Sequence, residues 1–177
     1  MLPPLRLELR VSEVELDTDR TPVRSIVAET RGELADLDME AAAPLTIAAN
    51  KLVGLGWRVV KRGRPGPEHD SPDDRNLVRH VHDLATLEPA ISQDTEAFAD
   101  LVARTVESDR PRFSSPDMSA REPIMQATHL LTEEIAYETE YADFVEQMSF
   151  ARDSERIGYR RAFDAYHRIV GYVFPLR

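Results

Sequence analysis

Apolar and charged residues alternate one by one near the start of the chain. Residues 5–11 read Leu-Arg-Leu-Glu-Leu-Arg-Val, and this period of two predicts a strand with one apolar face and one charged face that carries Glu8. Residues 17–22 have the composition of a turn. Residues 23–28 predict a second strand, antiparallel to the first. The front of the chain therefore predicts a small sheet.

From residue 44 the apolar residues recur every three to four positions, which predicts helices. Pro44 suits the first turn of a helix, because a proline there sacrifices no intrahelical hydrogen bond. That helix is expected over residues 44–58 and carries Lys51 on a largely apolar surface. Residues 74–87 predict the next helix, which Pro89 is expected to end.

The remainder of the chain is predicted to be helical. One helix is expected over residues 94–108, followed by a long proline-containing connection over residues 109–123. Residues 124–148 predict two helices or one broken helix, and Asp153 or Ser154 is a candidate cap for the last helix. These patterns predict an α/β fold class, with a short N-terminal sheet followed by a C-terminal helical bundle.

Composition narrows the class of protein. The chain has 177 residues, which suits one domain or one domain with a helical extension. It has no cysteine, no apolar run of about 18 residues and no signal-peptide pattern, so we expect a cytoplasmic protein that is not inserted in a membrane.

The net charge of −10 argues against sequence-independent nucleic-acid binding over the whole surface. It leaves room for a local basic patch, and Arg58, Lys61, Arg62 and Arg64 form one in the sequence. This patch is interpreted either as a solvated loop or as a contact for phosphate groups.

Candidate chemistry lies on the predicted helix of residues 74–87. Arg79 and Asp83 are four positions apart on the face opposite the apolar stripe, so they can pair on the helix surface. We expect this helix to lie beside the preceding one, so that Lys51 and Asp83 face one cleft. The alternatives are that Lys51 extends along an apolar surface to reach water, and that Arg79 and Asp83 form an ordinary surface ion pair.

The order of several motifs resembles the AbiEii-type abortive-infection toxins, a branch of the nucleotidyltransferase superfamily found in toxin–antitoxin pairs. A strand reading basic-apolar-acid-apolar around Glu8 precedes Pro44-Leu-x-x-x-Ala-x-Lys-Leu-x-x-Leu. Arg79-His-x-x-Asp-Leu follows, and then Tyr141-x-x-Phe-Val-x-x-Met-x-Phe. The resemblance covers most of the chain.

The resemblance implies a minimal nucleotidyltransferase fold with a mixed sheet flanked by helices. Residues 1–90 are then expected to form a partial α/β domain of this type, and residues 91–177 a helical domain. The implied activity is magnesium-dependent transfer of a nucleotide from an NTP to tRNA or protein, which blocks translation. The expected partner is a cognate antitoxin protein.

The resemblance also assigns roles to residues. It makes Lys51 the residue that binds the triphosphate, and Asp83 a base or the residue that orients Lys51. Glu8 is its candidate ligand for Mg²⁺. Arg79 and Arg58 are further candidates for binding the nucleotide.

The chain departs from the family at its start. The family has a glycine-rich turn and an Asp-x-Asp pair before the strand that matches Glu8, and no such pair precedes Glu8 here. Asp36-Leu-Asp38 has the matching letters but follows that strand. The alternative is a truncated, inactive relative that binds a nucleotide, RNA or a protein.

A lesser alternative uses the histidines. His69-Asp70, His80-x-His-Asp83, His129 and His167 are candidate ligands of an HD-type metal phosphohydrolase on a helical fold.

Overall fold

The fold was analysed in a computed structural model, which describes most of the chain from residue 17 onwards. The described residues are 17–23, 25–33, 37–62, 77–110, 119, 121–133, 135–147 and 156–175. Within them there are two strands and seven helices: β1 (Thr18–Val23), α1 (Ile26–Arg31), β2 (Leu37–Ala42), α2 (Pro44–Arg62), α3 (Arg79–Ile91), α4 (Thr95–Asp109), α5 (Arg121–Glu133), α6 (Ile135–Gln147) and α7 (Tyr159–Val173). The predicted α/β class, a short N-terminal sheet followed by helices, is confirmed.

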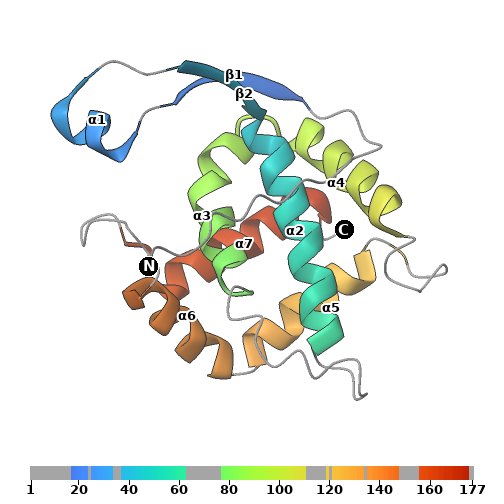
Figure 1. The fold of residues 1–177 in the computed structure, drawn as a ribbon. Coiled ribbons are helices and arrows are strands. Elements are labelled where there is room, and N and C mark those ends of the chain that lie inside the picture. Colours follow the sequence, from blue (N-terminus) through green and yellow to red (C-terminus); the bar gives the residue numbers. More distant parts are fainter. Residues whose placement is uncertain are drawn as a thin grey trace.

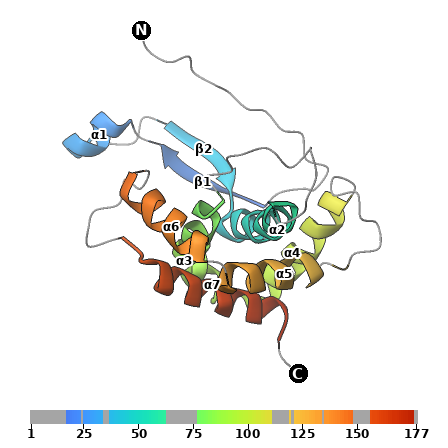
Figure 2. The ribbon, with the colours of Figure 1, turned by 90° about the horizontal axis from the view of Figure 1, so that it is seen from below.

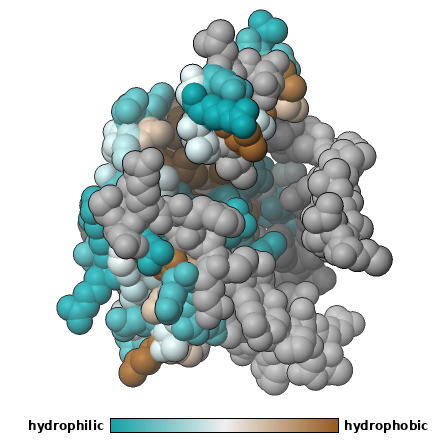
Figure 3. Space-filling view, turned by 60° about the vertical axis from the view of Figure 1, so that its left-hand side comes forward, coloured by the Kyte–Doolittle hydropathy of each residue, from teal (hydrophilic) through white to brown (hydrophobic). Residues whose placement is uncertain are grey.

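The sheet is a two-stranded antiparallel ribbon that lies apart from most of the helices (Figures 1 and 2). Thr18 pairs with Ala42 at one end and Val23 with Leu37 at the other. The register puts Val23, Leu37 and Met39 on one face, where they are 38% to 52% exposed. Figure 3 shows apolar surface among polar surface on one face of the molecule.

The core lies between helices, and α2 is at its centre (Figure 1). α2 packs against α3, α4 and α5, while α7 packs against α3 and α4. The side chains of Leu52, Leu55 and Val59 in α2 are fully buried, because they recur at helical spacing toward these neighbours. No described helix is long and apolar enough to span a lipid bilayer.

Polar contacts fix α7 against its neighbours. The Tyr166 and Thr128 hydroxyls lie 3.1 Å apart in the core, joining α7 to α5. The Tyr159 hydroxyl donates to the carbonyl oxygen of Leu131 at 2.8 Å. At the surface, Arg168 donates two hydrogen bonds to Glu88 of α3, at 2.5 and 2.7 Å. α7 is thereby tied to helices from both halves of the chain.

The front of the chain differs from the prediction. Residues 17–22 were expected to turn but form most of β1, and residues 23–28 were expected to be a strand but enter α1. The reason is local: the Ser25 hydroxyl accepts a hydrogen bond from the Ala28 N–H at 3.1 Å, which caps α1. The predicted strand of residues 5–11 lies outside the described residues.

Helix boundaries also differ. α3 begins at Arg79 rather than near residue 74, and it continues through Pro89 to Ile91. A proline in the last turn removes one N–H without ending the helix at that point. The N-cap of α7 is Gly158, so the predicted cap at Asp153 or Ser154, which lie outside the described residues, is wrong.

The other helices agree with the periodicity. α2 matches the prediction at its start but runs four residues further, to Arg62. α4 begins after Asp94, whose carboxylate accepts a hydrogen bond from the Ala97 N–H at 3.0 Å. The stretch of residues 124–148 holds two helices, α5 and α6. The division into domains near residue 90 stays a prediction. α2 and α3, from before this boundary, pack directly against α4, α5 and α7 from after it.

Gly56 sets the distance between α2 and α5, and this predicts a difference between two glycines of one helix. A Cβ at Gly56 would lie 3.1 Å from Ile124 Cγ1 and 3.3 Å from its backbone, whereas a Cβ at Gly54 meets nothing within 4 Å. Alanine improves helix propensity equally at both positions. We therefore expect Gly56→Ala to be about 1–3 kcal/mol less stable than Gly54→Ala in urea unfolding. Equal stabilities would show that α5 moves aside freely.

Candidate active site

Lys51 of α2 and Asp83 of α3 meet across the seam between the two helices. Lys51 Nζ lies 2.5 Å from Asp83 Oδ2, and the two side chains are 24% and 23% exposed. The apolar residues of both helices turn into the core and leave this pair at the edge of the seam. The prediction that the two helices lie side by side with these residues together agrees with the structure. Their catalytic roles stay a prediction.

A second contact follows one step along the same seam. Arg58 Nη1 of α2 lies 3.1 Å from His80 Nε2 of α3. Moving from Lys51 to Arg58 advances along α2, while moving from Asp83 to His80 goes back along α3, so the two helices run antiparallel. A guanidinium only donates, so His80 accepts this hydrogen bond through an unprotonated Nε2.

Arg79 is a second positively charged neighbour of Asp83. Its Nε lies 3.6 Å from Asp83 Oδ2, one turn earlier on α3, and its side chain is 56% exposed. Lys51, Arg58 and Arg79 thus form a cationic seam, a name used below for these three residues. The sequence pointed to each of them. The side chains of Lys61 and Arg62, and all of Arg64, lie outside the described part of the chain.

The cations keep Asp83 ionised. Burial alone would raise the pKa of Asp83, but the neighbouring His82 and Lys51 side chains and the charge of Arg79 lower it to about 2 from its ordinary 3.8. The His82 ring nitrogen is 4.0 Å from the carboxylate, too far for a hydrogen bond, so the Lys51 contact is the close one. Asp83 is therefore a carboxylate at neutral pH.

His82 faces α6 rather than the cationic seam. Its ring lies 6.2 Å from the Tyr141 ring and 5.7 Å from the Phe144 ring, and its Nε2 is buried without a hydrogen-bond partner in the described structure. Burial and the charge of Asp83 raise the pKa of Tyr141. α6 therefore adjoins the site. Tyr141 and Phe144 were not among the predicted site residues, and the feature of the sequence that pointed to them was the motif that begins at Tyr141.

The histidines are not gathered into a metal site in the part of the chain that the structure describes. His80 contacts Arg58, His82 packs on aromatic rings, and His129 and His167 are exposed on other helices. No group of three or more histidine, cysteine, aspartate or glutamate residues that could hold a metal is found there. His69 and Asp70 of the HD-type alternative lie outside the described residues.

The described residues also do not suit Mg²⁺ by themselves. Magnesium prefers several oxygen ligands in octahedral geometry. Asp83 offers one carboxylate, and Lys51 and Arg79 already neutralise its charge. Glu8, the predicted metal ligand, lies outside the described residues.

Comparison with known proteins gives one family. The model of the family described as nucleotidyl transferase AbiEii toxin, type IV TA system, matches residues 2–168. That match includes both helices of the cationic seam and the first two thirds of α7, up to Arg168. No curated protein and no solved structure matches the chain significantly.

The lowered pKa of Asp83 predicts a specific loss of stability in acid. A folded-state pKa of about 2 against an ordinary 3.8 means that the ionised form stabilises the fold above pH 4, and that this contribution disappears as the pH falls toward 2. The contribution is about 2 kcal/mol. We expect the free energy of unfolding of the wild type to exceed that of Asp83→Asn at pH 6 and to approach it at pH 2. The exposed Asp100→Asn should follow the wild type throughout; parallel curves for the wild type and Asp83→Asn would contradict this account.

Proposed function

The chain belongs to the AbiEii family of nucleotidyl transferase toxins of type IV toxin–antitoxin systems, and we propose that it transfers a nucleotide from an NTP at the cationic seam. The observation that carries this proposal is the contact of Lys51 Nζ with Asp83 Oδ2 at 2.5 Å. It places a lysine charge at a partly exposed edge, where a ligand can reach it.

The seam suits a triphosphate. Three cations, Lys51, Arg58 and Arg79, lie along two antiparallel helices of a chain whose net charge is −10. Nucleotide transfer depends mainly on positioning and on neutralising phosphate charge. Lys51 would act as a point charge on the triphosphate, while the Arg79 guanidinium can donate two parallel hydrogen bonds to phosphate oxygens.

Asp83 has two candidate roles, and its pKa favours one of them. A general base works best when its pKa is near the working pH. With a pKa of about 2, Asp83 is a weak base in the described state. We therefore favour Asp83 as the residue that holds Lys51 and Arg79 in position over Asp83 as the proton acceptor.

The proposed reaction is a displacement at the α-phosphorus of the NTP. A hydroxyl oxygen of the acceptor, on tRNA or on a protein, forms a bond to that phosphorus while the bond to the bridging oxygen breaks. Pyrophosphate leaves, and the hydroxyl proton passes to solvent. Family chemistry adds Mg²⁺, with Glu8 as its proposed ligand. We place the reaction in the cytoplasm, where NTP and tRNA are available, and propose a cognate antitoxin protein as partner.

A second function has its own support. Asp83, the carboxylate at the cationic seam, is already paired with Lys51 and Arg79, and this favours a relative that binds a nucleotide, RNA or a protein without turnover. Both functions use the same seam for the phosphates, so they differ in transfer and not in nucleotide binding.

Transfer of label separates the two functions. With Mg²⁺ and an NTP labelled on the α-phosphate, we expect the wild type to label total tRNA or a protein acceptor. Lys51→Ala should lower the rate at least about a hundredfold, because a charge that stabilises the transition state is lost. Arg104→Ala, an exposed cation on α4, serves as the matched control and should retain the wild-type rate. Absence of label with every NTP would leave only the binding function.

Asp83→Asn should affect binding and transfer in opposite directions. Removing the carboxylate frees Lys51 and removes a negative charge from beside the phosphates, an effect on the order of 1 kcal/mol near a surface. We expect NTP binding, measured by calorimetry, to tighten about fivefold, while transfer falls because Lys51 and Arg79 lose their common partner. Unchanged NTP binding by Asp83→Asn would place the phosphates away from the seam.

A further inference from the structure

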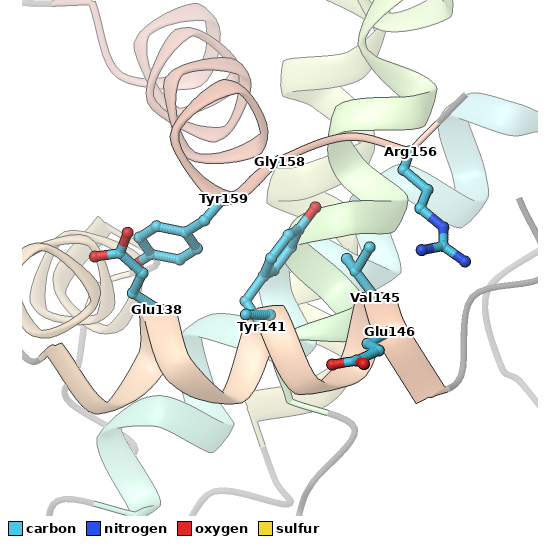
Figure 4. A pocket seen from close by; sticks show the side chains of 8 residues that line it. Glu138, Tyr141, Val145, Glu146, Arg156, Gly158 and Tyr159 are labelled. Atoms are coloured by element: carbon cyan, nitrogen blue, oxygen red, sulfur yellow. The ribbon is translucent and has the colours of Figure 1, made fainter. Parts of the chain in front are cut away.

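A groove with aromatic walls lies on the side of α6 that meets the start of α7 (Figure 4). It is open to solvent and has a volume of about 490 Å³. Tyr141 and Tyr159 line it, and their rings meet edge to face with centroids 5.4 Å apart. Val145 adds an apolar side. None of the three residues of the cationic seam lines the groove, although the ring of Tyr141 also lies 6.2 Å from the ring of His82.

The floor of this groove is rigid. The Tyr141 hydroxyl donates to the carbonyl oxygen of Ile157 at 2.8 Å, and the Tyr159 hydroxyl donates to that of Leu131. Both hydroxyls are therefore used within the protein. What the rings offer to a ligand is their apolar and π-electron surface, which suits an aliphatic stem, a flat group or a cation.

The acidic residues around the groove favour a positively charged ligand. Glu138 and Glu146 lie at its edges, and neither forms an ion pair among the described residues. Glu138 is close enough to Tyr159 that its charge, after the effect of burial, raises the pKa of that tyrosine to about 12. Arg156 also lines the groove, but it already has an interaction partner. α6 carries four acidic residues and no basic one.

We propose that this groove binds an arginine or lysine side chain presented by a protein partner. The stem of such a side chain would lie along Val145 and the tyrosine rings, and its charged end would face the Glu138 and Glu146 carboxylates. The acidic surface of α6 repels a phosphate backbone, so a protein segment fits the groove better than a nucleic acid does. The proposal depends on the shape and charge of the groove and is independent of any transfer activity.

Gly158 makes a sharp test possible. It lines the groove, its φ is −69°, and a Cβ built on it meets nothing within 4 Å, so a larger side chain is accommodated at the edge of the groove without backbone strain. Gly158→Leu should fill the groove. Gly158→Ala controls for the loss of glycine at the cap of α7. Gly171, on the exposed side of the same helix, also has no atom within 4 Å of such a Cβ, so Gly171→Leu is the matched control for added apolar surface.

The probe is a fluorescein-labelled peptide of alternating arginine and glycine, compared with a peptide of glutamate and glycine. We expect the arginine peptide to bind the wild type, Gly158→Ala and Gly171→Leu equally, and to bind Gly158→Leu at least tenfold more weakly. The double variant Glu138→Gln with Glu146→Gln should lose affinity to the same extent, whereas Glu96→Gln with Asp100→Asn on α4, which removes the same net charge, should not. The glutamate peptide should not bind.

Three results would overturn the proposal. Equal affinity of the arginine peptide for the wild type and Gly158→Leu would show that the peptide binds elsewhere. An equal loss in the α4 charge control would show attraction to net charge alone. Binding of a single-stranded RNA of similar length that is abolished by Gly158→Leu would assign the groove to nucleic acid.

Discussion

The packing of α2 against α3 is the contact on which the site depends. Fully buried side chains such as Leu52 and Leu84 hold the two helices together, and Lys51 and Asp83 meet at the edge of that contact. Removing charges from water costs free energy, which their attraction offsets only when the geometry is good. The Lys51–Asp83 pair meets this condition, because the apolar packing of the core, rather than the ion pair, fixes the distance between α2 and α3.

The protein separates charges of opposite sign on its surface. The chain as a whole is acidic, yet the cationic seam gathers three positive side chains on α2 and α3, while α6 carries only acids. Net charge is therefore a poor guide to either ligand. We propose phosphate as the ligand of the seam and a cation as the ligand of the groove. His82 lies between them, with its Nδ1 4.0 Å from Asp83 Oδ1 and its ring centroid 6.2 Å from that of Tyr141.

Sequence patterns predicted the helices well and the sheet poorly. Long periodic stretches such as α2 and α4 are identifiable because one face must be apolar to meet the core. The β1–β2 ribbon buries little of either face. β1 reads Thr-Asp-Arg-Thr-Pro-Val and shows no alternation of apolar and polar residues, so Asp17 to Pro22 looked like a turn. The meeting of Lys51 and Asp83 was predictable from helix faces. The contact of His82 with Tyr141 was not, since it joins α3 to α6, two helices that are far apart in the sequence.

One consequence concerns how the sequence of α3 can change over time. Asp83 faces the cationic seam, His82 supports the wall behind the groove, and Glu88 receives both hydrogen bonds from Arg168. Three sides of one short helix are therefore committed to different neighbours. A replacement at one of these positions shifts α3 and so changes its contacts with the other neighbours too. We therefore expect divergent relatives to change α3 together with the residues it contacts on α2, α6 and α7, rather than one position at a time.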